Sequence, residues 1–89
     1  MFSMKVLEKQ LKALANRRRL AIVKFLKKSN KASVGNIARE IKLSFKSTSR
    51  HLALLLAADI VDKEQVNLHM FYAINPSPSS VSKYIINLL

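Results

Sequence analysis

Residues 43–52 read Leu-Ser-Phe-Lys-Ser-Thr-Ser-Arg-His-Leu, and the other elements of the chain can be placed relative to this stretch. Ser44 is of a residue type that caps helix N-termini, so the sequence predicts a helix from Phe45 to about Ala58. One stripe of this helix recurs at helical spacing and is expected to face a core: Thr48, Leu52 and Leu55. The stretch is therefore predicted to be a surface helix with one buried side.

The opposite side of this predicted helix carries hydroxyl and cationic side chains, with no carboxylate between Glu40 and Asp59. Such a surface fits the phosphates and base edges of a nucleic acid. For His51, two interpretations are equally good: a contact to a phosphate or a base, or a partly buried ring bonded to a backbone carbonyl. The candidate nucleic-acid contacts in this stretch are Ser44, Lys46, Ser47, Ser49, Arg50 and His51.

The net charge of the chain is +11 and is unevenly distributed. Residues 1–58 hold 14 Lys and Arg against two Glu, a net charge of +12. Residues 59–89 hold two Lys against three acids, a net charge of −1. Positive potential concentrated in this way attracts phosphate polyanions, so nucleic-acid binding is favoured over a basic surface that serves only solubility.

Length and composition exclude several classes of protein. Eighty-nine residues suffice for a single domain, 1–89. With no Cys and two His, the sequence predicts no disulfide, no metal and no other cofactor. It has a single Gly and lacks a phosphate-cradling loop or paired acids, so an enzyme is not expected. The longest apolar run, 52–58, is too short to span a membrane, and the first five residues show no signal-peptide pattern. We therefore expect a cytoplasmic, nucleoid-associated protein without membrane contact.

Two helices are predicted before the central one. The first covers residues 3–15 and has an apolar stripe at Met4, Leu7, Leu11 and Leu14. The second is capped by Asn16 and runs from Arg17 to about Ser29. Arg17, Arg18 and Arg19 lie in its first turn, where the helix dipole disfavours cations. We expect phosphate contacts from these three arginines, with a buried ion pair as an equal alternative for Arg19.

A short helix and a tight turn connect these elements to the central helix. Residues 32–34 are predicted to form either a very short strand or a helix cap. Ser33 would introduce a third helix over residues 34–42, and Leu43-Ser44 would form the connection. Two helices joined in this way form a helix-turn-helix, although the Gly usual in its turn is absent.

The last third of the chain is predicted to form a hairpin and one more helix. Alternating side chains predict strands over residues 60–66 and 69–75, with Asn67 at a positive φ in the turn. Two strands are only marginally stable alone, so the hairpin is expected to lean on the helices. The resulting order, α-α-α-α-β-β-α, is mainly α with a small β-hairpin and is that of a winged helix-turn-helix. Ser77 as the cap and Pro78 as the first residue predict the final helix, over 77–89.

The final helix is unusually apolar for a terminal helix. Lys83 is its only charged residue, and apolar side chains occupy more than one of its sides. Such a face suits packing against a second chain, and closure of the subunit's own core is the alternative.

Several segments resemble the ArsR/SmtB-type winged-helix repressors. Residues 14–23, Leu-Ala-Asn-Arg-Arg-Arg-Leu-Ala-Ile-Val, resemble that family's LADPTRLRIL, and residues 33–38, Ser-Val-Gly-Asn-Ile-Ala, resemble its SVxELA. Residues 43–52 resemble LSxSTVSRHL, the most specific match. Residues 58–61, Ala-Asp-Ile-Val, resemble the family's AGLV, and residues 72–74, Tyr-Ala-Ile, resemble its YxL. The similarity therefore continues in order through roughly residues 11–75.

This resemblance implies a homodimeric repressor that binds double-stranded DNA. It also implies that the first and last helices, here residues 1–15 and 77–89, form the dimer interface. The side chains expected there are Leu7, Leu11, Val81, Tyr84, Ile85 and Leu88.

The chain departs from the family pattern at several positions. Metal sensors of the family have a Cys pair in the helix matching 34–42 and His and acidic ligands in the terminal helix, and this chain has neither. Asp59 and Asn67 stand where the family has Gly, and both residue types tolerate positive φ. Asp62 and Glu64 occupy the wing, where the family is often Arg-rich, so strong wing contacts to DNA are not expected.

The function predicted from the sequence is that of a homodimeric, sequence-specific transcriptional repressor whose helix over 44–58 reads the major groove. Lys46, Arg50 and some of residues 17–19 would bind phosphates, while Lys46, Ser47 and Ser49 would contact base edges. The alternative is a winged-helix protein-interaction module whose basic face binds an acidic partner.

Overall fold

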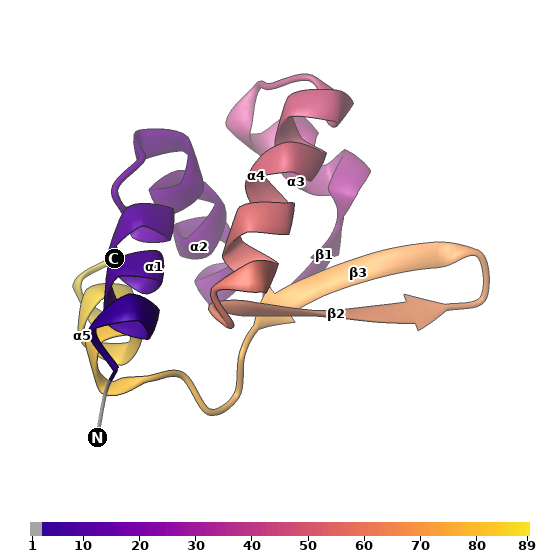
Figure 1. Cartoon of the computed structure of the whole chain (residues 1–89). Coiled ribbons are helices and arrows are strands. Elements are labelled where there is room, and N and C mark those ends of the chain that lie inside the picture. The colour runs from indigo at the N-terminus through magenta and orange to yellow at the C-terminus, as the bar shows by residue number, and fades with distance from the viewer. Residues whose placement is uncertain (1–2) are drawn as a thin grey trace.

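The computed structural model describes residues 3–89, so residues 1 and 2 of the predicted first helix lie outside the described residues. Within this range the order of elements is α1 (Met4–Leu14), α2 (Arg17–Ser29), β1 (Lys31–Ser33), α3 (Val34–Ile41), α4 (Phe45–Ala57), β2 (Val61–Val66), β3 (His69–Ile74) and α5 (Ser80–Leu88). The β2–β3 hairpin projects from one side of the helical body, and α1 and α5 form the other side (Figure 1). The predicted winged helix-turn-helix fold, mainly α with a small hairpin, is confirmed.

Side-chain caps fix the start of the helices that carry the predicted site. The Asn16 Oδ1 accepts hydrogen bonds from two amides of the first turn of α2, at 3.0 and 3.1 Å. The hydroxyls of Ser33 and Ser44 each accept one from the amide three residues later, at 3.2 and 3.1 Å. These bonds satisfy amides that have no partner inside the helix, so all three predicted starts are confirmed.

The last helix begins later than predicted. The Ser77 amide donates to Asn75 Oδ1 at 2.9 Å in the preceding loop, and Ser79 is the residue whose hydroxyl caps α5. Pro78 therefore lies before the helix, and the prediction of Ser77 and Pro78 as its start was wrong. A tertiary contact accompanies the shift, because the Asn75 side chain also donates to the Asp59 carbonyl oxygen at 3.0 Å and so ties this loop to the end of α4.

A third strand joins the predicted hairpin. β1 pairs antiparallel with β3, so the strand order is β1-β3-β2, with Ala32 opposite Tyr72. Both alternatives for residues 32–34 hold in part, because Ser33 ends β1 and also caps α3. The predicted element order lacked this strand, since three residues have no periodicity of their own. The added strand supports a hairpin that would be marginal alone.

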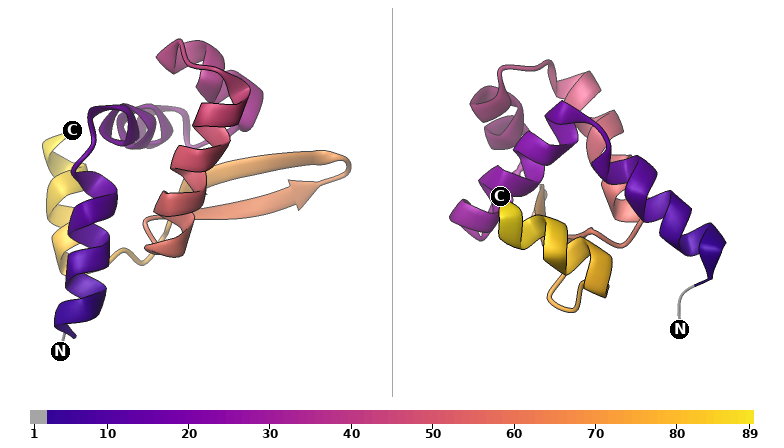
Figure 2. Two further views of the ribbon diagram at one scale, coloured as in Figure 1. Left: turned by 45° about the horizontal axis from the view of Figure 1, so that its top comes forward. Right: turned by 90° about the vertical axis from the view of Figure 1, so that its left-hand side faces the viewer.

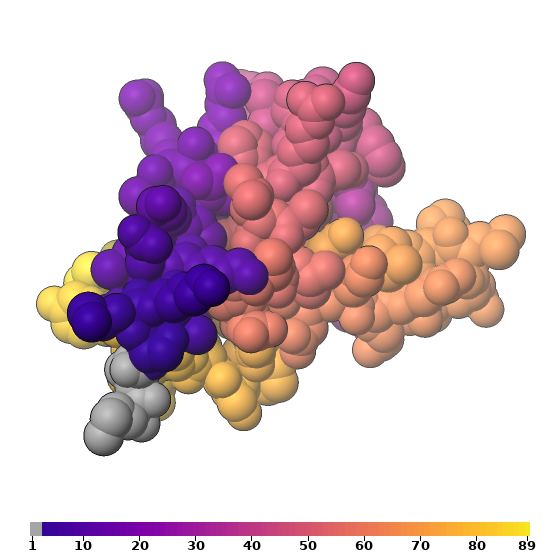
Figure 3. Space-filling model, in the orientation of Figure 1, coloured from indigo at the N-terminus to yellow at the C-terminus, as the bar shows by residue number. Residues whose placement is uncertain are grey.

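The backbone of the hairpin follows the prediction at its turns. Asp59 and Asn67 both have φ of 58°, the positive values expected of residues that replace Gly. Val61 is buried at the base of β2, and the other residues of that strand are exposed. The hairpin therefore stands out from the body as a ribbon, as Figure 3 shows.

One core lies beneath the helix-turn-helix. Its largest fully buried side chains come from α2, α3, α4 and the start of the hairpin: Ile22, Leu26, Ile37, Leu52, Leu55 and Ile60. The predicted buried stripe of α4 is confirmed, because Thr48, Leu52 and Leu55 are all fully buried. The core therefore fixes the side of α4 that faces inward and, with it, the side that faces solvent.

α1 does not bury the whole apolar stripe that the sequence predicted for it. Leu14 is buried, but Met4 and Leu11 are exposed, and the polar side chain of Gln10 is buried instead. Gln10 Oε1 accepts from the Ser79 hydroxyl at 2.9 Å, and Gln10 Nε2 donates to the Ala58 carbonyl at 3.5 Å. A buried amide with partners on two other elements thus links α1 to the end of α4 and the start of α5.

Candidate nucleic-acid interface

The turn between α3 and α4 holds the two helices of the motif at a fixed angle. Lys42 ends α3 with φ of 56° and ψ of 51°, the left-handed conformation usually taken by Gly. The Leu43 amide then donates to the Ala38 carbonyl at 3.0 Å. Lys42 thus takes the part of the missing Gly, and the chain reaches Ser44 in position to start α4.

The outer face of α4 presents the side chains that the sequence singled out. Lys46 and Arg50 are exposed, and Ser47 and Ser49 are half-buried. The Ser44 oxygen accepts a hydrogen bond in the cap, which leaves its hydroxyl proton free to donate. α4 has no acidic residue, so its positive N-terminal end and its cations reinforce one another toward an anion.

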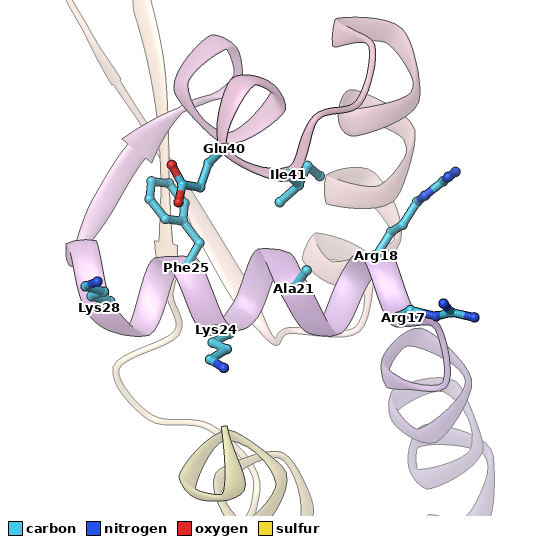
Figure 4. Close-up of a pocket in the computed structure, with 8 residues that line it drawn as sticks. All are labelled: Arg17, Arg18, Ala21, Lys24, Phe25, Lys28, Glu40 and Ile41. Atoms are coloured by element: carbon cyan, nitrogen blue, oxygen red, sulfur yellow. The ribbon is translucent and has the colours of Figure 1, made fainter.

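Arg17 and Arg18 extend this basic surface at the start of α2. They line a groove of about 450 Å³ between α2 and α3, together with Ala21, Lys24, Phe25, Lys28, Glu40 and Ile41. In Figure 4 both guanidinium groups point away from the groove, and Lys24 and Lys28 point in other directions. The cations therefore do not converge on one small anion, and the arginines are placed for an extended polyanion.

Arg19 differs from its two neighbours. Its guanidinium donates to the Ala13 carbonyl and, at 3.1 Å, to the Lys12 carbonyl, which are orphan acceptors at the end of α1. Its third contact is with His51 Nδ1 at 3.2 Å. The buried ion pair offered for Arg19 was wrong, because these partners are carbonyls and an imidazole. These contacts use three of the five guanidinium N–H groups and hold the Arg19 side chain between the end of α1 and His51.

His51 lies on the flank of α4, half-buried against this guanidinium. The predicted bond to a backbone carbonyl is replaced by the bond to Arg19. A guanidinium can only donate, so Nδ1 accepts and the ring proton is assigned to Nε2. Burial, and then the charges of Arg19 and Arg18, lower the pKa of His51 below 6.5. Arg19 of α2 thus joins the end of α1 to His51 of α4, and the sequence contained no signal for this link beyond the two residue types.

The wing carries the opposite charge pattern. Asp62 and Glu64 are exposed on β2, and Lys31 Nζ lies 3.9 Å from Glu64 Oε1. Both partners are exposed, so this pair contributes little to stability. Leu68 at the turn is 94% exposed. The wing therefore offers carboxylates and an apolar tip where the central helix offers cations.

The face formed by α1 and α5 is apolar and open to solvent. The two helices lie in contact on the same side of the molecule, as the right-hand view of Figure 2 shows. Tyr84 and Leu88 are 66% and 67% exposed, and Leu11 is also exposed. The other residues predicted for a dimer interface are half-buried: Leu7, Val81 and Ile85.

Within residues 3–89, no three His, Cys, Asp or Glu side chains come together as metal ligands. The helices of the same range are too short and too polar to cross a bilayer.

Comparison with known proteins agrees with this geometry. The family model described as bacterial regulatory protein, arsR family, matches residues 16–63, which contain the whole helix-turn-helix. No curated protein sequence matches the chain.

Solved structures match nearly the whole chain. Reduced HlyU from Vibrio cholerae is 34% identical, with 97% of this chain and 86% of that chain covered and a TM-score of 0.80. The transcriptional repressor PagR of Bacillus anthracis is 26% identical, with coverages of 97% and 95% and a TM-score of 0.80. The homodimeric winged helix-turn-helix DNA-binding domain of Mb0332 from Mycobacterium bovis, 24% identical over 96% and 76%, shares the fold with a TM-score of 0.83.

The helix-turn-helix, its basic face and these similarities all agree. Regulators of this kind act by binding DNA and not by catalysis. The chain belongs to the arsR family of bacterial regulatory proteins and is a DNA-binding transcriptional regulator.

Proposed function

We propose that this regulator is a homodimeric, sequence-specific repressor that places α4 in the major groove of its operator. The observation that carries the proposal is the division of α4 into two sides. Thr48, Leu52 and Leu55 are fully buried, so the core holds the helix, while Lys46 and Arg50 stand free on the side that lacks any acid. A recognition helix needs both a fixed inner side and a polar, cationic outer side.

The outer residues take different roles in this proposal. Arg50, Arg17 and Arg18 are exposed cations and bind phosphates, which position the protein on the duplex. Lys46, Ser47 and Ser49 contact base edges. Lys donates preferentially to the acceptors of guanine, whereas the Ser hydroxyl can bond either donors or acceptors on the bases. Ser44 donates its hydroxyl proton to a phosphate. Arg19 and His51 position α4 against α1 and do not touch DNA.

Dimerisation would set the spacing of two recognition helices. Leu11 of α1 and Tyr84 and Leu88 of α5 are exposed apolar side chains on two helices that lie in contact, and burying them in a dimer would remove apolar surface from water. A two-fold dimer predicts a near-palindromic operator whose half-sites lie about one helical turn apart, roughly 34 Å. Repression is the direction of control that PagR, similar over 97% of this chain, is described as exerting.

The DNA-binding part of the proposal is tested by fluorescence anisotropy. The wild-type chain is titrated against a random duplex at increasing salt, and then against sites selected from a random pool. We expect log K to fall linearly with log salt concentration, because phosphate binding releases counterions. Lys46→Ala with Arg50→Ala should weaken the selected site by more than about 100-fold and reduce the salt slope by about two.

The matched control removes two positive charges elsewhere. Lys63→Ala with Lys83→Ala changes the net charge equally but lies in the acidic third of the chain, so it should leave affinity within about threefold. Equal losses in both double variants would overturn the assignment of α4. Absence of DNA binding even at low salt would favour the acidic protein partner instead.

The dimer is tested by measuring mass in solution. Leu88→Glu places a charge in the proposed interface and should convert a dimer into a monomer. Leu68, at the tip of the wing, is also an exposed leucine but lies outside that interface, so Leu68→Glu should leave the dimer intact. A wild-type monomer at micromolar concentration would contradict this part of the proposal.

A further inference from the structure

Phe45 is a large aromatic side chain for which the proposed contacts leave no role. It is the first residue of α4 and is 63% exposed. The other large exposed apolar residues of the described chain lie on α1 and α5, at the far end of α4 and on the wing: Met4, Val6, Leu11, Tyr84, Leu88, Leu54, Val66 and Leu68. Phe45 alone among them sits at the DNA-facing end of the proposed recognition helix.

The fold explains the position of Phe45 but not its exposed ring. Phe45 precedes Thr48 by three residues and so continues the stripe of Thr48, Leu52 and Leu55. That stripe is fully buried further along, but at position 45 the helix has passed beyond the core. Packing within the subunit therefore leaves most of the Phe45 side chain in solvent.

The surroundings of Phe45 form an open groove between the helix-turn-helix and the wing. The groove holds about 400 Å³ and is lined by Phe45, the start of α3 and the turn of the hairpin, namely Ser33, Val34, Gly35, Leu68, His69 and Met70. A methyl group built on Gly35 would meet nothing within 4 Å, so this side of the groove is not closed by the chain. The ring is therefore reachable by a ligand that approaches the start of α4.

From this placement we infer that Phe45 recognises the 5-methyl group of a thymine in each half-site. The inference rests on the proposed function, which brings the N-terminal residues of α4 to the base edges. In the major groove, the thymine methyl is the apolar feature that an aromatic side chain can contact. Lys46 beside it would select guanine acceptors, so neighbouring residues of one helix would recognise two chemically different base edges.

The test removes one methyl group from the DNA without changing base pairing. Each thymine of the selected operator is replaced in turn by deoxyuridine, in both half-sites, and affinity is measured by anisotropy. For the wild type, one symmetric pair of replacements should weaken binding about fourfold per half-site, as expected for one buried methyl group. Both half-sites together should then lose about fifteenfold, because distant sites add.

Variants of the protein link this loss to one side chain. Phe45→Ala should bind thymine and deoxyuridine operators equally, and Phe45→Leu should keep part of the discrimination. The control is Leu54→Ala, which truncates another exposed apolar residue of α4, 52% exposed, and should keep the full discrimination. Circular dichroism melts establish that each variant is folded. The comparison of thymine and deoxyuridine operators with the wild type does not depend on any variant.

Three results would overturn this inference while leaving the proposed function standing. They are wild-type binding that is unchanged by loss of any thymine methyl group, a Phe45→Ala variant that keeps the wild-type loss, and a selected half-site without thymine. If the wild type selects no site from the pool, the proposed function fails, and this inference fails with it.

Discussion

The central helix α4 and the β2–β3 wing belong to the same subunit, yet they differ in anchoring and in charge. α4 has a fully buried side and no acid, whereas β2 is buried only at Val61 and carries Asp62 and Glu64. The hairpin stands well clear of the helices in Figures 1 and 3. The position of an element in the fold is thus not enough to make it a DNA contact, because its charge decides whether phosphates attract it.

The difference in anchoring between α4 and the wing should produce the largest effect on stability. Leu52→Ala should destabilise the protein by about 3 kcal/mol, because it leaves a cavity under α4. Leu68→Ala on the wing tip should change the free energy of unfolding by less than about 0.5 kcal/mol, since an exposed side chain loses no contacts. Urea unfolding of both variants measures this, and similar losses would mean that the wing is anchored as firmly as the helix.

A second prediction concerns the residue that links α4 to α1. Arg19→Ala should cost about 2 kcal/mol, because it leaves two carbonyl oxygens and His51 without their donor. Arg18→Ala should leave stability within about 0.5 kcal/mol and weaken DNA binding instead. If urea denaturation gives the same loss for both, the distinction between an anchoring arginine and a phosphate-binding arginine fails.

The difference in charge between α4 and the wing is tested by removing the wing carboxylates. Asp62→Asn with Glu64→Gln should raise DNA affinity about threefold at 0.1 M salt, provided that the wing lies within a Debye length, about 10 Å, of phosphates. Glu8→Gln on α1 is the control and should have no effect. An affinity unchanged by the wing variant would place the wing beyond that distance.

The smallest expected effect is a dependence of stability on pH. The pKa of His51 is lowered in the folded protein, so the unfolded chain binds its proton more readily. Stability from this group is therefore present above pH 6.5 and is lost as the pH falls toward the lowered folded value. Thermal melts of wild type and His51→Gln should diverge in this window, because glutamine does not titrate.

Identical pH profiles for wild type and His51→Gln would show that the Arg19–His51 bond is not linked to protonation.

Much of the helix-turn-helix could be predicted because its signals are local. A cap such as Asn16 or Ser44 bonds an amide two or three residues away, and the stripe of α4 repeats within a few turns. The Asn67 turn is equally local. The start of α5 was predicted wrongly because its local Ser-Pro signal competed with the bond between Asn75 and Asp59, which no short window contains.

The candidate site followed the same division. The outward positions of Lys46 and Arg50 follow from helical period alone, since a buried stripe fixes the opposite side. The different role of Arg19 from that of Arg17 and Arg18 could not be predicted, because three consecutive arginines carry the same local signal. Only the end of α1 and the ring of His51, brought close by packing, distinguish them.

The sequence by itself determined the type of every element except β1, the helix starts at Asn16, Ser33 and Ser44, and the concentration of positive charge in the first two-thirds of the chain. These depend on side-chain chemistry and on interactions within about four residues. The tertiary structure alone decided that β1 pairs with β3, that Gln10 is buried and that Arg19 holds His51. Each of these joins residues far apart in the chain, and their partners are set by how the helices pack, which no local pattern encodes.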